Sequence, residues 1–320
     1  MIRAHQREFS LVAAIALLAL VLALVAPGFF SPSNLRDLLM SNLPALIVAL
    51  GMTLIILTAE IDISVGSIFA ICSVAAGVFA KAGLPTPLAG LAACAAGAVF
   101  GAINGALIAY VRIPSIVVTL AAMVALRDGL RWITEGAWVQ DLPSNFQWFG
   151  QTQNVSDAIA VAVAVILTIA LAWSLRNLSA GRAVYATGSA PHAARFAGID
   201  PARVVFGVFL FTGALTGCAA FLNAVRFNQI PSNAGLGFEL RVIAAVIVGG
   251  VSVSGGRGTL AGTVLGVILL GMIGPALTFL GINAYWERAI QGAIILAAVA
   301  IDALQSKSGS YAGSLAAERA

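Results

Sequence analysis

The chain contains very few charged residues. Only 9% of its 320 residues are Asp, Glu, Lys or Arg, whereas 60% are hydrophobic and the mean hydropathy is +1.01. Soluble domains carry about 25% charged residues, so a chain of this composition could not cover its own surface in water. Many apolar runs reach about 20 residues, the length that crosses a hydrocarbon layer roughly 30 Å thick. The composition excludes a soluble domain and predicts an all-α, polytopic membrane protein.

Residue types that carry chemistry are also scarce. The sequence has two histidines and three cysteines, and Cys72, Cys94 and Cys218 all lie in apolar runs without a CxxC pair. These cysteines are expected to be small buried hydrophobic residues, not redox or metal-binding groups. The HExxH and GxSxG patterns of hydrolases are missing as well. No catalytic residue, metal site or cofactor is therefore expected, and the chain is not expected to be an enzyme.

Nucleotide and nucleic-acid binding are also disfavoured. The glycine-rich segment 249–262 lacks the Gly-Lys-Ser/Thr of a phosphate-binding loop, and no strand precedes it. It is expected to form a tight turn between two helices, because glycine tolerates positive φ. The net charge is +4 and the pI about 9.3, which Lys- and Arg-enriched cytoplasmic loops explain without a nucleic-acid partner.

Ten membrane-spanning helices are expected. Residues 1–306 form one transmembrane permease-like domain, and residues 307–320 form a cytoplasmic C-terminal tail. The spans are placed at about residues 9–29, 43–59, 64–82, 87–110, 114–133, 157–175, 203–225, 240–254, 259–280 and 288–304.

The distribution of charge orients these spans. The loop at residues 176–203 contains four arginines against one aspartate, whereas the loop at 134–157 contains acidic residues and neither Lys nor Arg. Because Lys and Arg accumulate in cytoplasmic loops, the first loop should be cytoplasmic and the second external. With ten spans, the N-terminus and the C-terminus are then both cytoplasmic.

A weak internal repeat accompanies this topology. Residues 97–105 read GAVFGAING in the fourth span, and residues 262–266 read GTVLG in the ninth, with Gly271 and Gly274 following. Copies five spans apart run in opposite directions, which indicates a 5+5 inverted repeat, a common transporter construction. Ordinary packing of helices through small residues would also account for these glycines.

The segment 57–67, LTAEIDISVGS, places two carboxylates between apolar runs. A carboxylate at bilayer depth costs roughly 2–4 kcal/mol on insertion scales, so Glu60 and Asp62 need partners, a water-filled cavity or a membrane boundary. This pattern predicts a helix break that lines a polar path. Asp62 could cap the following helix or contact a polar solute.

The basic loop contains a short helix of about two turns, PHAARFA, between Pro191 and Gly198. Such a helix is too short to be stable alone in water. Small alanines beside Phe196 and Arg195 suit a helix that sits in a groove of another protein. A helix lying on the lipid surface is the alternative, but its apolar face is small.

Two groups near the external side have ordinary interpretations. Arg127, Asp128 and Arg131 end the fifth span, where a solvated helix end with an Asp128–Arg131 pair is expected, or alternatively a contact with an external docking protein. The external loop is aromatic, which is typical of an interfacial belt or, alternatively, of a platform for an external partner. Its aromatic residues are Trp138, Phe146, Trp148 and Phe149.

Four ordered segments carry a resemblance to a known family. They read LTAEIDISVGS at 57–67, GAINGALIAYVRIPSIVVTLAAM at 101–123, Gly181 followed by RAVYATGSAPHAARFAGI at 182–199, and FELRVIAAVIVGGVSVSGGRGTLAGTVLGVILLG at 238–271. With YWERAIQGAIILAAV at 285–299, the likeness covers nearly the whole chain. The chain resembles the inner-membrane permeases of bacterial ABC importers for ribose, xylose, arabinose, rhamnose and autoinducer-2.

The resemblance implies a set of partners. In such importers two permease copies or paralogues form the pathway, two cytoplasmic ABC ATPase subunits drive it, and a periplasmic sugar-binding protein delivers the solute. Membrane lipid surrounds the pair in the bacterial inner membrane. The resemblance assigns ATPase coupling to residues of the basic loop: Gly181, Arg182, Gly188, Ser189, Pro191, Arg195, Phe196 and Gly198.

This sequence departs from the family pattern at a few positions. Ala190 stands where Asn is common and is a poor helix cap, so Ser189 is expected to cap instead. His192 stands where Glu is common, and Ala59-Glu60 where the family often has two glycines or polar residues. Docking strength and local polarity could differ as a result.

The resulting hypothesis is a permease subunit that carries a monosaccharide, a pentose or a deoxyhexose such as rhamnose. Its pathway is expected to be lined by small and polar residues, with Asp62, Ser64, Ser67 and Asn104 as candidates. The alternative is an ion-coupled secondary sugar transporter, although such carriers place acidic or histidine relays well inside their helices.

Overall fold

The computed structural model describes residues 2–283, 285–294 and 296–297. Across this part of the chain the backbone forms helices and loops and no β-strand, apart from an isolated antiparallel bridge between Val139 and Ile230. The all-α prediction is therefore confirmed. The tail 307–320 and the second half of the tenth predicted span, 298–304, lie outside the described residues.

The elements follow the predicted order. They are α1 (Ile2–Val25), η1 (Pro27–Phe30), α2 (Pro32–Leu57), α3 (Val65–Lys81), α4 (Thr86–Ala109), α5 (Ser115–Thr134), η2 (Gln147–Gly150), α6 (Gln153–Asn177), α7 (Ser179–Ser189), α8 (Pro191–Phe196), α9 (Pro201–Ala224), α10 (Phe238–Val248) and α11 (Leu260–Phe279). Residues 286–294 are helical as well. Of the described helices, α1, α2, α4, α6, α9 and α11 are long and apolar enough to cross a membrane.

The shorter helices match the two predicted spans that are richest in small residues. Helix α3 has 17 residues and α10 has 11. The eighth span was predicted to run to residue 254, but α10 ends at Val248. Gly249 and Gly250 follow, and Gly250 adopts a φ of 89° that only glycine takes easily.

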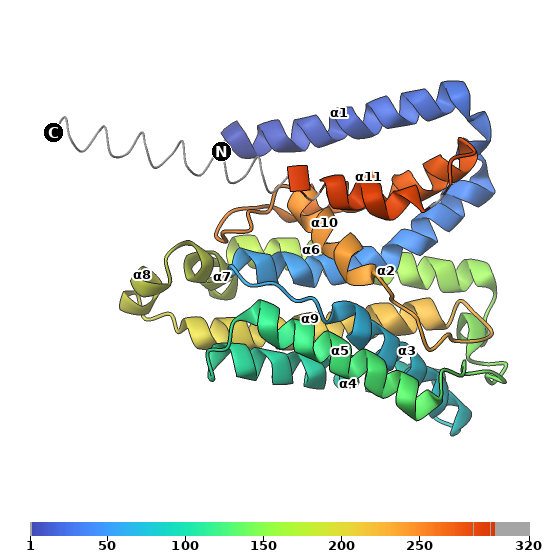
Figure 1. Ribbon diagram of the computed structural model, residues 1–320, viewed down its shortest axis with the longest axis horizontal. Coiled ribbons are helices and arrows are strands. Elements are labelled where there is room, and N and C mark those ends of the chain that lie inside the picture. The colour runs from blue at the N-terminus through green and yellow to red at the C-terminus, as the bar shows by residue number, and fades with distance from the viewer. Residues whose placement is uncertain (1, 284, 295, 298–320) are drawn as a thin grey trace.

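Helices α2 and α9 form the centre of the bundle, and α4 packs along α9 over much of its length (Figure 1). Glycines make this close approach possible. A Cβ atom on Gly97 or Gly101 of α4 would collide with the α9 backbone, and one on Gly213 or Gly217 of α9 would collide with the α4 backbone. Small residues at a helix contact let the two backbones touch, the usual solution in membranes.

The bundle has two ends of different character (Figure 1). At one end lie α7 and α8 together with the loops that follow α2 and α10. At the other end, the loop at residues 135–152 meets the loop at residues 225–237, where Val139 and Ile230 exchange N–H···O bonds of 2.9 Å. The two loops therefore form one connected cap on the bundle.

The aromatic residues of the loop at 135–152 were predicted to form an interfacial belt or a platform for a partner, and neither role fits all of them. Phe146 is completely buried, and both Phe146 and Phe149 pack their rings edge-on against Phe221 of α9. These two rings anchor the loop to the bundle core, so for them the predictions of an interfacial belt and of a partner platform are both wrong. Trp138 remains 47% exposed.

Candidate functional site

The break after α2 holds a buried polar cluster. Residues 58–64 are not helical, and Ala59 adopts a positive φ of 64°. Asp62 Oδ1 accepts hydrogen bonds from the Ser64 backbone N–H at 2.8 Å and from its hydroxyl at 2.6 Å. Asn104 Nδ2, on α4, donates to the same Ser64 hydroxyl at 2.8 Å. Three of the four predicted pathway residues therefore form one hydrogen-bonded chain.

The structure also decides how Asp62 acts locally. Its carboxylate binds the N–H of Ser64, the residue that precedes the first residue of α3, and α3 has no side-chain cap. Asp62 therefore forms a tight turn before the helix instead of capping it, so the capping alternative is wrong. Its side chain is buried, with 1% of its surface exposed. A hydrogen-bonded turn is what makes a carboxylate tolerable at such a site.

Helix α5 supports the same break, which the sequence did not indicate. The Ser115 hydroxyl accepts a bond from the Ile61 N–H at 3.3 Å, and the Thr119 hydroxyl lies 3.3 Å from the Ile61 carbonyl, to which it donates. The fourth candidate, Ser67, lies apart from this chain and donates to the Met123 carbonyl at 2.8 Å. All four candidates are buried in this conformation, and their role in a pathway stays a prediction.

A second polar cluster surrounds Gly66 at the start of α3. Arg127 of α5 donates to the carbonyls of Ala234 and Gly235, each at 3.1 Å. Glu239, in the first turn of α10, is buried beside it, and a Cβ on Gly66 would clash with the Glu239 carboxylate and the Gly235 carbonyl. The expectation of a solvated helix end is wrong for Arg127. It holds for Asp128 and Arg131, which pair at 3.9 Å and are largely exposed.

The basic loop folds into two helices. The predicted short helix is confirmed as α8, with Pro191 in its first turn and Gly198, at a φ of 79°, just after its end. Helix α7 was not predicted, because its glycines and serines gave the segment the composition of a loop. Arg195 is exposed and Phe196 is 94% exposed, the highest value among large hydrophobic residues of the described chain.

The other residues of the loop have different surroundings. Arg182 is exposed, whereas Gly181 packs against the backbone of Leu175 so tightly that a Cβ would clash. Ser189 was expected to cap α8, and this is wrong. Its hydroxyl donates to the Tyr185 carbonyl within α7 at 2.7 Å, and Ala190 occupies the cap position without a side-chain bond.

The glycine-rich segment joins α7 to the break after α2. Gly256 donates its N–H to the carbonyl of Leu57, the last residue of α2, at 2.9 Å. Gly188 of α7 lies against the same Leu57 carbonyl, where a Cβ would collide with it. The Tyr185 hydroxyl donates to the Gly258 carbonyl at 2.9 Å. We call this meeting of 57–59, 185–189 and 255–258 the glycine junction.

Burial raises the pKa of the Tyr185 phenol above its ordinary value. The phenol therefore stays protonated throughout the neutral range, and its hydrogen bond to Gly258 persists there.

Comparisons with known proteins identify the family. The family model described as branched-chain amino acid transport system / permease component matches residues 34–299. The chain is 34% identical over 302 residues to an autoinducer 2 import system permease protein of Enterobacter sp. (strain 638), covering 92% of this chain and 86% of the relative. It is also 34% identical over 297 residues to a ribose import permease protein of Escherichia coli (strain K12), covering 92% of each chain.

The chain belongs to this permease family. Its relatives are permease subunits of ABC importers, which are not themselves enzymes, and membership implies ATPase and periplasmic binding-protein partners. The predicted resemblance is confirmed, and the ion-coupled alternative finds no support among these relatives. No solved structure matches the chain significantly.

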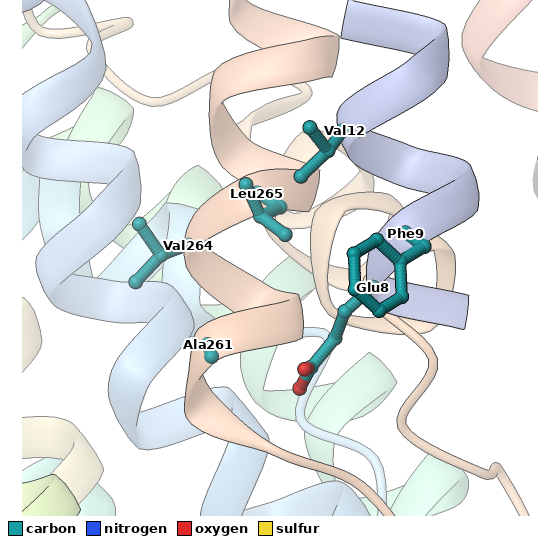
Figure 2. Close-up of a pocket in the computed structure, with 6 residues that line it drawn as sticks. All are labelled: Glu8, Phe9, Val12, Ala261, Val264 and Leu265. Carbon is teal, nitrogen blue, oxygen red and sulfur yellow. The ribbon is translucent and has the colours of Figure 1, made fainter. Parts of the chain in front are cut away.

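A cavity of the permease lies away from the polar cluster. It is an apolar cleft of about 490 Å³ between α1 and α11, shown in Figure 2 with Phe9, Val12 and Leu265 on its wall. Its one charged group, Glu8, accepts a 2.7 Å bond from Thr259, which caps α11 through the Gly262 N–H. A carboxylate near a helix N-terminus is favourable, so Glu8 has a structural partner. The hydrogen bond between Glu8 and Thr259 therefore joins the start of α1 to the start of α11.

Proposed function

We propose that this chain is the membrane subunit of an ATP-driven importer for a monosaccharide, a pentose or a deoxyhexose such as rhamnose. The names of its relatives support this class, since the proteins 34% identical to it include a ribose import permease and an autoinducer 2 import permease. The buried Asp62–Ser64–Asn104 chain, together with the separate Ser67 of α3, would supply the polar groups of the pathway.

We propose that α7 and α8 face the cytoplasm, as do both termini. The arginine-rich composition of 176–203 supports this orientation. The start of α1, the break after α2 and the glycine-rich segment would then be cytoplasmic too, because the helices place them at the same end as α7 (Figure 1).

We also propose ten spans arranged as two inverted halves. Support comes from two short–long helix pairs, since α3 packs on α4 and α10 packs on α11. The glycine motifs of the two halves make different contacts, however. Those of α4 face α9, whereas Gly262 and Gly266 of α11 face α10. The order of helices therefore supports the repeat better than the glycines do.

The glycine junction is the observation that carries the proposed mechanism. Helix α8 would sit in a groove of the cytoplasmic ATPase, with Arg195 and Phe196 as its contacts. Movement of α8 and α7 would pass through Gly188 and Gly256 to the Leu57 carbonyl, and so to the break that holds Asp62. Backbone contacts without intervening side chains are stiff, so they suit the transmission of small displacements.

The remaining partners follow from this arrangement. A second copy of the permease or a paralogue would complete the pathway, and a periplasmic sugar-binding protein would dock at the opposite end. Helix α1 exposes a row of large apolar side chains, including Leu17, Leu20 and Leu24, which would face lipid.

Uptake by vesicles tests the proposal. Vesicles that contain the permease, its ATPase and its binding protein should take up labelled ribose, xylose or rhamnose only when ATP is supplied. Uptake that continues without ATP and without the ATPase, and that an uncoupler abolishes, would contradict the proposal.

A further inference from the structure

A second cavity opens at the end of the bundle opposite α7 and α8. It has a volume of about 360 Å³ and lies where α3 and the end of α9 meet the connected loops 135–152 and 225–237. Small-molecule sites usually occupy about 300–1,000 Å³, so one small solute would fit. The cavity does not include the Asp62–Ser64–Asn104 chain, and nothing in the mechanism above uses it.

Three aromatic rings line this cavity, and they come from three different segments. They are Phe69 of α3, Trp138 of the first loop and Phe227 of the second. Trp138 is 47% exposed and Phe227 is 46% exposed, so both have free ring surface. Phe69 is held against Phe238, with ring centroids 4.7 Å apart. An aromatic face carries partial negative charge and attracts the slightly positive C–H groups of a saturated ring.

Three carboxamide side chains share the same cavity: Asn223, Asn228 and Gln229. Asn228 and Gln229 are exposed, and the three amides make no hydrogen bond to any described residue. Each amide offers both donors and an acceptor, so it can bind a hydroxyl group in either direction. Their sequence neighbour Arg226 does not line the cavity: it donates to the Met40 carbonyl at 2.8 Å and lies over the Phe227 ring.

Among the described residues that line the cavity, none carries a charge. An amino acid brings a carboxylate and an ammonium group, and burying either without a charged or well-oriented partner is costly. A neutral ring that bears several hydroxyls matches the lining better. Its apolar face can stack on an aromatic ring while its hydroxyls reach the amides.

We propose that this cavity is a receiving site for a neutral, ring-form sugar at the outer face of the permease. The sugar would occupy it before it enters the bundle. The assignment rests on the proposed function, because the direction of transport decides which end of the bundle receives the solute.

The test measures binding and uptake in lipid vesicles that contain the full-length permease, its ATPase and its periplasmic binding protein. The probes are D-ribose, D-xylose and L-rhamnose, with L-leucine as the charged comparison. We expect the double substitution Asn228→Ala/Gln229→Ala to weaken binding of the imported sugar by about tenfold. Trp138→Ala should weaken it similarly, whereas Trp138→Phe should retain most of the affinity because a ring face remains.

Matched controls exist in the same region. Asn233 is an exposed amide of the same loop outside the cavity, and Trp132 is an 83% exposed tryptophan of α5 outside it. Asn233→Ala and Trp132→Ala should leave binding and uptake unchanged. Because the substituted amides are exposed and form no bond to described residues, their removal should not affect insertion, which co-purification with the ATPase checks.

The outcomes distinguish failure of the receiving site from failure of the proposed function. If the wild-type complex imports a sugar with ATP but the cavity variants bind and import it normally, the receiving site is wrong and the proposed function stands. If the wild-type complex imports none of the three sugars, or imports L-leucine instead, the proposed function is wrong and the receiving site is wrong with it.

Discussion

Close backbone contacts occur both between α4 and α9 and at the end of the bundle that contains α7 and α8, but the two contacts differ in extent. Both rely on glycines that bring backbones together, namely Gly97 against Gly213 in the first and Gly188 against Leu57 in the second. The first contact extends along two long helices and lies inside the bundle. The second is a local contact beneath α7, which is followed by α8 with its almost fully exposed Phe196 side chain.

Under the proposed mechanism, this difference separates a fixed part of the permease from a moving part. A long contact between backbones fixes α4 and α9 as a unit, because separating them would lose packing along their whole length. A point contact under α7 can transmit a displacement without resisting it over a large area. Substitutions at the two places should therefore damage different properties, stability at the first and coupling at the second.

The largest effect is expected from Gly213→Leu. Its side chain would enter the α4 backbone at Gly97, and overpacking of this kind costs about 3 kcal/mol or more when backbone blocks it. Thermal unfolding of the purified permease in detergent should show the loss. Gly207→Leu is the matched control on the same helix, because a Cβ at Gly207 meets no atom within 4 Å. Equal stability of the two variants would mean that α4 and α9 are not fixed together.

The next effect concerns docking. Arg195→Asp/Phe196→Asp should weaken binding of the ATPase by about 2 kcal/mol or more, roughly 30-fold, since exposed aromatic and arginine residues dominate interfaces. Co-purification and a binding titration measure this change, and the unfolding temperature should stay the same because both side chains are exposed. Arg112→Asp, at an exposed cation in the loop between α4 and α5, is the control. If the variant still binds the ATPase with wild-type affinity, the proposed coupling role of α8 is wrong.

A smaller effect on stability, but a clear one on transport, is expected from Gly188→Ala. The added methyl would press on the Leu57 carbonyl and displace α7 at a cost of about 1–2 kcal/mol. ATPase binding should persist while sugar uptake per ATP hydrolysed falls. Gly129→Ala in α5, where a Cβ meets no atom within 4 Å, should leave both unchanged. Normal uptake by Gly188→Ala would show that the glycine junction does not transmit movement.

The smallest effect is expected from Tyr185→Phe, which removes the hydrogen bond to Gly258 and should cost about 1 kcal/mol. Because burial raises the pKa of the phenol, the stabilising effect is complete below its unfolded pKa of about 10 and is lost as the pH rises through the folded value. The difference in stability between wild type and variant should therefore be constant from pH 6 to about 9 and shrink above pH 10. A difference that disappears at neutral pH would contradict this assignment.

Local signals predicted the helices well where they are strong. Pro191 and Gly198 bracketed α8 correctly, because proline at a first turn and glycine after a last turn act through their own backbone angles. Helix α7 was missed because the local backbone preferences of its glycines are misleading there. Gly181 and Gly188 disfavour a helix locally, and only their close packing against Leu175 and Leu57 makes them suitable there.

The candidate site was predicted residue by residue but not as an assembly. Asp62 and Asn104 were both selected from the sequence, yet nothing in it indicated that Ser64 connects them. Arg127 was misassigned to a solvated end, because the carbonyls that it binds lie more than 100 positions away in the chain. The cap assigned to Ser189 was wrong because its hydroxyl found a nearer carbonyl inside α7.

The sequence by itself determined that this protein is a membrane bundle, in what order its helices come, and where most of them begin and end. These properties depend on hydropathy and on backbone hydrogen bonds between residues four positions apart, which neighbouring residues control. Only the tertiary structure decided which polar groups are buried together and which glycines touch. Those contacts join segments far apart in the chain, and in an apolar medium each buried polar group must find its partner wherever the packing of helices places one.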